Sequence, residues 1–104
     1  LAGDDVAVVS DAGTPLINDP GAELVAAAHT AGVPTVPIPG ASAVTAALSV
    51  CPFPCYPFRY IGFLPAKKSA RRKSLEAALS GTDALVFFEA PHRIADTIKD
   101  LASL

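Results

Sequence analysis

The most constraining feature of this sequence is a succession of three segments. A run typical of a buried strand is followed by a loop rich in glycine and proline, and then by a segment with a helical pattern. The apolar run "VAVVS", Val6 to Ser10, is continuous rather than alternating, which is typical of a strand in a parallel sheet covered on both faces. The segment "GAELVAAAHTAG" is rich in alanine and helical in register up to Gly32. Asp19 suits the cap of this helix and Pro20 its first turn. The pattern predicts one strand and one crossover helix.

The same alternation continues along the chain. "VPTVPIPG" predicts a short strand near a sheet edge because of its prolines, and "ASAVTAALSV", Ala41 to Val50, predicts a helix. Further on, "YIGFL" and "ALVFFE" are strand-like, "KKSARRKSLEAALSG" is a helix ending at Gly81, and "PHRIADTIKDLASL" starts a helix with Pro91 in its first turn. Strands alternating with helices predict an α/β fold with largely parallel sheets.

A rigid segment divides these elements into two groups. "CPFPCYPFR", Cys51 to Arg59, contains three prolines and three aromatic residues, which predicts a packed connector between domains. We expect residues 1–56 to end a first α/β domain and residues 57–104 to begin a second. Two-stranded parallel sheets rarely stand alone, so either the halves share one four-stranded sheet or the chain is an excerpt of a larger two-domain protein. We favour the excerpt, because the sequence opens directly on a core strand.

Composition gives weaker constraints. The 104 residues carry a formal net charge of −2, which gives no global attraction to nucleic acid or membrane. No apolar stretch approaches the roughly 20 residues of a membrane span and no leader pattern opens the chain, so we expect a soluble, cytoplasmic protein. The spacing of Cys51 and Cys55 fits neither a redox motif nor a zinc hairpin, and His29 and His92 are far apart. We therefore expect buried or connector thiols and no metal site.

Two loops follow the first two predicted strands. They are "SDAGTP", Ser10 to Pro15, and "PGASA", Pro39 to Ala43. If the strands are parallel neighbours, both loops open on the same sheet edge, where ligands of open α/β sheets bind. Their glycines would let a ligand approach the main chain. Neither loop matches the phosphate or dinucleotide motifs, which disfavours nucleotide triphosphates and NAD. The alternative is that the glycines merely make tight turns.

A third strand end, "FFEAPHR", carries a carboxylate and an imidazole where a strand meets a helix. Glu89 and His92 could act as acid, base or orienting pair. Alternatively, Glu89 accepts amide hydrogen bonds at the helix N-terminus and pairs with Arg93.

The segment "KKSARRKS" contains five of the eight basic residues of the chain. These are Lys67, Lys68, Arg71, Arg72 and Lys73. Charge of this density forms either a solvated helix face or a phosphate-contacting patch for RNA.

Four motifs in this order, "VAVVSDAGTPLINDPG", "VPIPGASAVTAAL", "YIGFLPAKKSARRKSLE" and "LVFFEAPHRI", closely resemble the ribosomal RNA small subunit methyltransferase I family. That family belongs to the tetrapyrrole (corrin/porphyrin) methylase superfamily. The resemblance covers nearly the whole chain, with Asn18 standing where the family often has Ser. It implies an enzyme of two α/β domains that holds S-adenosylmethionine in the cleft between them. The implied activity is 2′-O-methylation of a cytidine ribose in small-subunit (16S) ribosomal RNA.

The resemblance also implies site residues. The donor-binding residues would be Ser10, Asp11, Ala12, Gly13, Thr14, Pro39, Gly40, Ala41 and Ser42. "GFLP", Gly62 to Pro65, and "EAPHR" would face the same cleft, with Glu89 or His92 as proton acceptor or orienting group. The RNA-binding residues would be Lys67, Lys68, Arg71, Arg72, Lys73 and Arg93.

Ribosomal RNA or the small ribosomal subunit is the implied partner, a homodimer is possible, and the isolated chain is not expected to be active. Two rival functions remain open at this point. One is methylation of a precorrin or porphyrin by another enzyme of the superfamily. The other is a non-catalytic RNA-binding or assembly module that has kept the fold.

Overall fold

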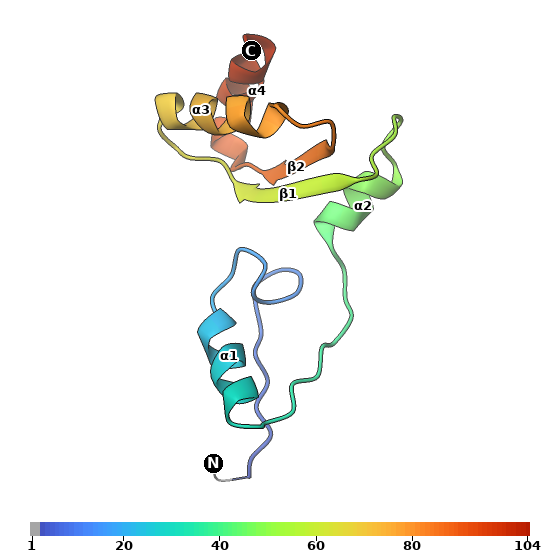
Figure 1. The fold of residues 1–104 in the computed structure, drawn as a ribbon, viewed down its shortest axis with the longest axis vertical. Helices are drawn as coiled ribbons and strands as arrows, with labels where there is room; N and C mark the ends of the chain where they lie inside the picture. Colours follow the sequence, from blue (N-terminus) through green and yellow to red (C-terminus); the bar gives the residue numbers. More distant parts are fainter. Residues whose placement is uncertain (1–2) are drawn as a thin grey trace. The chain divides into compact units, whose positions relative to one another are not determined.

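The computed structural model describes residues 3–104, and the chain divides into two compact units. The first unit ends at Ala46 and the second runs Ala47–Leu104. Figure 1 traces the elements along the chain in the order α1, α2, β1, α3, β2, η1 and α4. The division falls within α2, Ala43–Ser49.

The first unit is built around one helix, α1, Ala22–Thr30, which lies where the alanine-rich segment predicted it. Its C-terminus is closed by two backbone bonds, from Gly32 N–H to the His29 carbonyl and from Val33 N–H to the Ala28 carbonyl. This is the Schellman pattern, and Gly32 accommodates it with a φ of +68°. The cap predicted at Asp19 is wrong, because Gly21 occupies the N-cap and no side chain caps the helix.

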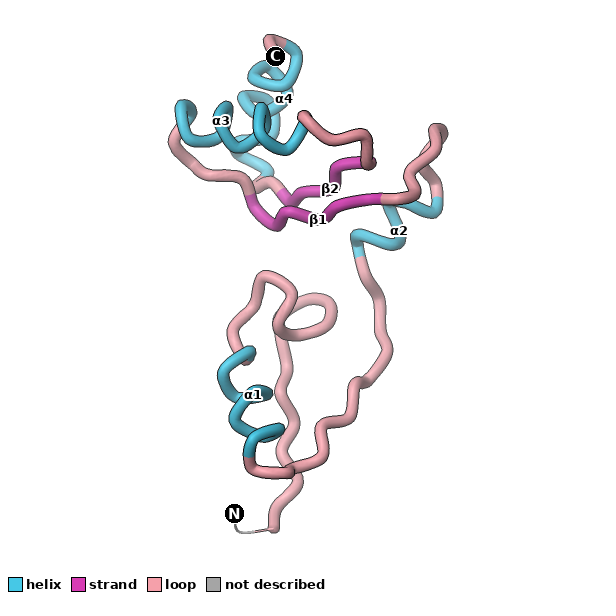
Figure 2. Tube along the Cα trace, viewed as in Figure 1, coloured by secondary structure: helices cyan, strands magenta, loops and turns pink. Residues whose placement is uncertain are grey.

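The two strands predicted for the first unit are also wrong. Residues 6–10 and 33–40 form no hydrogen-bonded ladder and run as loops (Figure 2). A strand needs a partner for its N–H and C=O groups, and three prolines in 33–40 also remove donors. The apolar side chains are correspondingly open to solvent, with Val6 81% and Val9 83% exposed.

The second unit confirms the predicted order of elements. β1, Phe58–Phe63, and β2, Ala84–Phe88, form a two-stranded parallel sheet, with an irregularity in the pairing between Tyr60 and Phe63. α3, Lys68–Leu79, connects the two strands. The 3-10 turn η1, Pro91–Arg93, and then α4, Ile94–Ala102, follow β2. The helices α3 and α4 lie on the same side of the sheet in Figure 1.

The core of the second unit contains few apolar side chains and several polar ones. Within the described chain, the buried hydrophobic residues are Leu64 and Leu75, at 3% and 0% exposure. Ring contacts between Tyr60, Phe63 and Phe88, with centroids 5.2 and 5.6 Å apart, add to the packing on the sheet. Three polar or charged residues are equally buried, namely Arg71, Thr97 and Asp100. Polar contacts therefore contribute much of what holds α3, α4 and the sheet together.

The connector before β1 and strand β2 line a common pocket. Cys51 and Cys55 are free, half-buried thiols, in agreement with the prediction of connector thiols. They line an open, mostly apolar pocket of about 250 Å³ together with Leu48, Phe53 and residues 84–87 of β2. The Cys55 thiol donates to the Leu48 carbonyl at 3.5 Å.

Two further properties concern residues 3–104 as a whole. No helix in this range combines the length and apolar character needed to cross a membrane. In the same described range, His, Cys, Asp and Glu side chains do not form a cluster of three or more that could hold a metal ion.

Candidate functional site

The two glycine-containing loops of the first unit approach each other. Gly13 has a φ of +74°, and a Cβ built there would lie 3.8 Å from the Ala41 carbonyl oxygen. The Ser10 hydroxyl closes the first loop on itself by donating to the Ala12 and Gly13 carbonyls at 3.3 and 3.0 Å. The second loop ends at Ser42, whose Oγ accepts from Thr45 N–H at 3.5 Å as α2 begins.

The exposure of these loops fits a binding role. Among the predicted donor-binding residues Ser10 is half-buried, and the others, from Asp11 to Thr14 and from Pro39 to Ser42, are exposed. Main-chain groups and the short Asp11 and Thr14 side chains are therefore accessible on both loops. Exposed peptide groups next to a glycine without a side chain let a small molecule contact the backbone directly.

The first loop contains backbone geometry that the sequence patterns did not predict. Leu16 and Asn18 both have positive φ, at 77° and 62°. Asn tolerates this region, but for Leu it is unusual. The Leu16 side chain packs against Gly21, where an added Cβ would lie 3.2 Å from Leu16 Cδ1. The glycine before α1 is the sequence signal that could have indicated this close approach.

In the second unit, Glu89 lies directly after β2, and both of its carboxylate oxygens accept hydrogen bonds. Its side chain is 1% exposed. One carboxylate oxygen accepts from Ala90 N–H at 2.8 Å and from Arg93 Nη2 at 2.6 Å, and the other accepts from the Thr97 hydroxyl at 2.6 Å. This is the arrangement that the alternative reading of "EAPHR" anticipated. His92 lies in η1 and is exposed.

These contacts set the protonation state of Glu89. The hydrogen bond from Thr97 is the largest influence and lowers the pKa of Glu89, burial opposes it, and Ala90 N–H and Arg93 lower it further. The net pKa lies below the ordinary value of a glutamate. Glu89 is thus an ionised carboxylate at neutral pH, with its lone pairs largely occupied.

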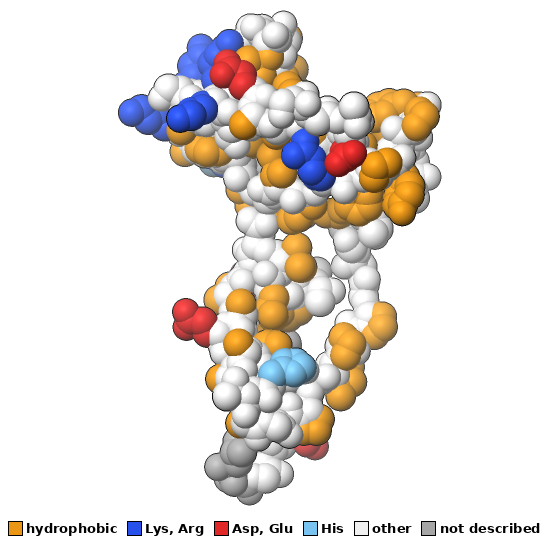
Figure 3. Space-filling model, viewed as in Figure 1, with side chains coloured by type: hydrophobic (Ala, Val, Ile, Leu, Met, Phe, Trp, Pro, Cys, Tyr) orange, Lys and Arg blue, Asp and Glu red, His pale blue; other side chains and the backbone are white. Residues whose placement is uncertain are grey.

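The basic run lies on α3 and the turn before it, and its members occupy different environments. Figure 3 shows Lys and Arg side chains gathered in this part of the second unit. Arg71 differs from the others because its side chain is 6% exposed. Its Nε and Nη2 donate to Asp100 Oδ2 at 2.8 and 2.6 Å, and its Nη1 donates to the Ala66 carbonyl at 3.2 Å. The geometry of Arg71 is therefore that of a packing residue rather than an open phosphate contact.

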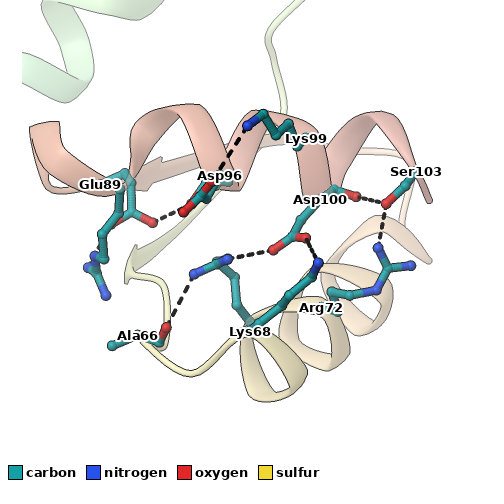
Figure 4. Close-up of polar contacts among 11 residues, drawn as sticks. Ala66, Lys68, Arg72, Glu89, Asp96, Lys99, Asp100 and Ser103 are labelled. Carbon is teal, nitrogen blue, oxygen red and sulfur yellow. Dashed lines mark hydrogen bonds and ion pairs between the residues drawn. The ribbon is translucent and has the colours of Figure 1, made fainter.

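Two other members of the run also face α4, as Figure 4 shows. Lys68 Nζ lies 3.7 Å from Asp100 Oδ1, although the lysine side chain is 74% exposed. Arg72 Nη1 donates to the Ser103 hydroxyl at the surface. Lys67 and Lys73 are exposed.

Asp100 is consequently the anion that organises α3 and α4. Burial acts to raise the pKa of Asp100, but the hydrogen bond and charge of Arg71, helped by the charge of Lys68, outweigh it and lower the pKa. The sequence patterns did not single out Asp100 or Thr97. The spacing of the apolar residues in α4 suggests that Ile94 and Ile98 face the core, yet these are 49% and 58% exposed while Thr97 and Asp100 are buried.

Comparison with known proteins agrees with the motifs. The family of tetrapyrrole (corrin/porphyrin) methylases matches residues 1–104. The chain belongs to this family. Its resemblance to ribosomal RNA small subunit methyltransferase I is confirmed by several relatives of that name.

Three of these relatives illustrate the similarity. The protein from Micromonospora olivasterospora is 56% identical over 102 residues, which cover 98% of this chain and 33% of the relative. The protein from Xylella fastidiosa is 51% identical over 104 residues, which cover 100% of this chain and 38% of the relative. The protein from Escherichia coli O157:H7 is 46% identical over 102 residues, which cover 98% of this chain and 36% of the relative. The chain thus spans about a third of the length of these relatives.

The lowered pKa of the buried Asp100 predicts a specific loss of folding stability at acid pH. Because the pKa of Asp100 is lower in the folded state, its contribution to stability is complete above the unfolded pKa, roughly 3.9 for Asp, and is lost as pH falls through the folded pKa. We expect Asp100→Asn to reduce the fall in melting temperature between neutral and acid pH. Asp96→Asn on the same helix is the matched control, since that carboxylate is 71% exposed. Equal pH dependence of both variants would contradict the assignment.

Proposed function

We propose that the full-length protein containing this chain transfers a methyl group from S-adenosylmethionine to the 2′-oxygen of a cytidine ribose in small-subunit ribosomal RNA. The observation that carries the proposal is the approach of the Gly13 and Ala41 loops. It is supported by relatives named ribosomal RNA small subunit methyltransferase I, which match nearly all of this chain. In this proposal residues 1–56 belong to a first domain and residues 57–104 to a second, in a cytoplasmic enzyme.

The two loops fit a small methyl donor. The left-handed Gly13 brings main-chain groups to the surface without a side chain in the way, and Asp11 offers a negative charge to a cationic sulfonium. In the proposal, the residues from Ser10 to Thr14 and from Pro39 to Ser42 hold the donor. Bound S-adenosylmethionine supplies an activated methyl group, so the task of the protein is mainly to align the ribose oxygen with it and to handle one proton.

Glu89 and His92 have different roles in this proposal. The occupied lone pairs and lowered pKa of Glu89 make it a poor proton acceptor, and they support an orienting role in which it holds Arg93 and η1 in place. His92 is exposed on that turn and is our candidate to accept the hydroxyl proton. Arg93, with a side chain 21% exposed, and the exposed lysines of the basic run would contact RNA phosphates.

The donor site is tested by two glycine variants of the full-length protein. Gly13 and Gly32 both have left-handed backbone, with φ of +74° and +68°, so replacement by Ala strains both similarly. Only the methyl group of Gly13→Ala lies between the loops, whereas a Cβ at Gly32 meets nothing within 4 Å. By calorimetry we expect Gly13→Ala to weaken S-adenosylmethionine binding about tenfold, ~1.4 kcal/mol, and Gly32→Ala to leave it unchanged.

The same proteins test the reaction. Labelled methyl groups should enter the small ribosomal subunit or its RNA at a cytidine 2′-oxygen. Incorporation into a precorrin instead would identify a tetrapyrrole enzyme. Failure of the wild-type protein to bind the donor at all would identify a non-catalytic module.

The division of roles is tested by single-turnover rates of the full-length protein. We expect His92→Gln to lower the rate by about 10²-fold, within the usual range for removing an acid–base group. Glu89→Gln should slow the reaction less, because in this proposal Glu89 only orients its neighbours. If Glu89→Gln lowers the rate by this factor and His92→Gln leaves it unchanged, the roles are reversed.

A further inference from the structure

Three of the five basic side chains of the α3 run already meet oxygen atoms on the last turn of α4. Arg71 and Lys68 contact the two carboxylate oxygens of Asp100, and Arg72 donates to Ser103 Oγ. The Ser103 hydroxyl in turn donates to the Asp100 carbonyl at 2.8 Å. Figure 4 shows Lys68 and Arg72 reaching toward this turn.

We propose that the last turn of α4, Asp100 to Ser103, is a built-in competitor for RNA phosphate: bound RNA takes Arg72 and Lys68 from this turn and leaves Arg71 in place. This inference deepens the proposed function and rests on it, because it concerns the same RNA-binding surface.

The chemistry of the turn resembles that of a phosphate. It presents one carboxylate and a hydroxyl oxygen at the C-terminus of a helix, where the backbone carbonyls carry partial negative charge. Guanidinium and ammonium groups favour such a position as they favour a phosphodiester. Lys68 and Arg72 therefore each exchange one anionic or polar oxygen for another when RNA binds.

Burial decides which cations can exchange. Arg71 and Asp100 have side chains 6% and 4% exposed, so separating them would leave a buried charge without its partner. The Lys68 side chain is 74% exposed and its contact is long, at 3.7 Å. The contact between Arg72 and Ser103 is also at the surface. Surface contacts of this kind are weak and exchange readily with a competing anion.

The competition has measurable consequences for binding. Breaking the contact between Arg72 and Ser103 opposes RNA binding, so its removal should strengthen binding. Because Lys68 is partly neutralised by Asp100 beforehand, it should also release fewer counterions on meeting a phosphate than an unpaired lysine does.

The test uses the full-length protein, a fluorescein-labelled RNA oligonucleotide and fluorescence anisotropy at several salt concentrations. We expect Ser103→Ala to tighten RNA binding about fivefold, which corresponds to ~1 kcal/mol, because binding no longer has to break this surface contact of Arg72. Ser80→Ala is the matched control, because Ser80 also follows a helix C-terminus and bonds only locally, to the Ala77 carbonyl at 2.8 Å. Its RNA affinity should equal that of the wild type.

Repeating the Ser103→Ala substitution in the Arg72→Gln protein makes the test specific. In Arg72→Gln protein, Ser103→Ala should have no effect on RNA affinity, because the contact that it removes is already gone. An unchanged or weaker affinity of Ser103→Ala, at unchanged melting temperature, would overturn the inference. So would a gain that persists with Arg72→Gln.

Failure of the inference can be told from failure of the proposed function. A wild-type protein that methylates ribosomal RNA, but whose affinity does not respond to Ser103→Ala, rejects the competition alone. A wild-type protein that neither binds RNA nor methylates it rejects both.

Discussion

The buried ion pair between Arg71 and Asp100 is the interaction on which the second unit most depends. It joins α3 to α4 through two hydrogen bonds to one carboxylate oxygen, and both side chains are almost completely buried. The apolar side chains buried beside it in the described chain are few. Desolvating two charges is costly, and the cost is recovered only while both partners are present. The pair therefore fixes how the two helices meet more than it adds net stability.

The same helix, α4, contacts both the end of β2 and the basic run of α3. Thr97 and Asp100 lie three residues apart and are its buried residues. Thr97 holds Glu89 at the end of β2, and Asp100 holds Arg71 in the basic run. The turn that carries His92 and the helix that carries the exposed lysines are thus both positioned from one helix face. A change in how α4 packs would therefore shift both the turn that carries His92 and the helix that carries the lysines.

The sequence predicted the second unit better than the first. Its strands and helices occur in the expected order because each local pattern has its partner within residues 47–104, as in the pairing of β1 with β2. The apolar run Val6–Ser10 is typical of a strand, but a strand forms only where another strand pairs with it through hydrogen bonds. The approach of the Gly13 and Ala41 loops was expected because both would follow neighbouring parallel strands. The loops do approach each other, although residues 6–10 and 33–40 form no sheet.

The roles of individual charged residues were less predictable. Arg71 and Lys73 are equivalent in the sequence pattern, since both belong to one basic run, yet one is buried and the other exposed. The difference arises because Asp100, distant in sequence, pairs with Arg71. Likewise, the engagement of Glu89 depends on Thr97, one helix further along the chain. Pairings between distant polar residues follow from tertiary packing and leave little trace in local patterns.

The most direct test of this account is a double-variant cycle on the central pair. Arg71→Met, Asp100→Leu and the double variant of the full-length protein would be compared by urea unfolding. The account predicts that each single change destabilises by about 3–5 kcal/mol, because it leaves one buried charge unpaired, while the double variant is close to the wild type. Losses that simply add in the double variant would contradict the central role of the pair.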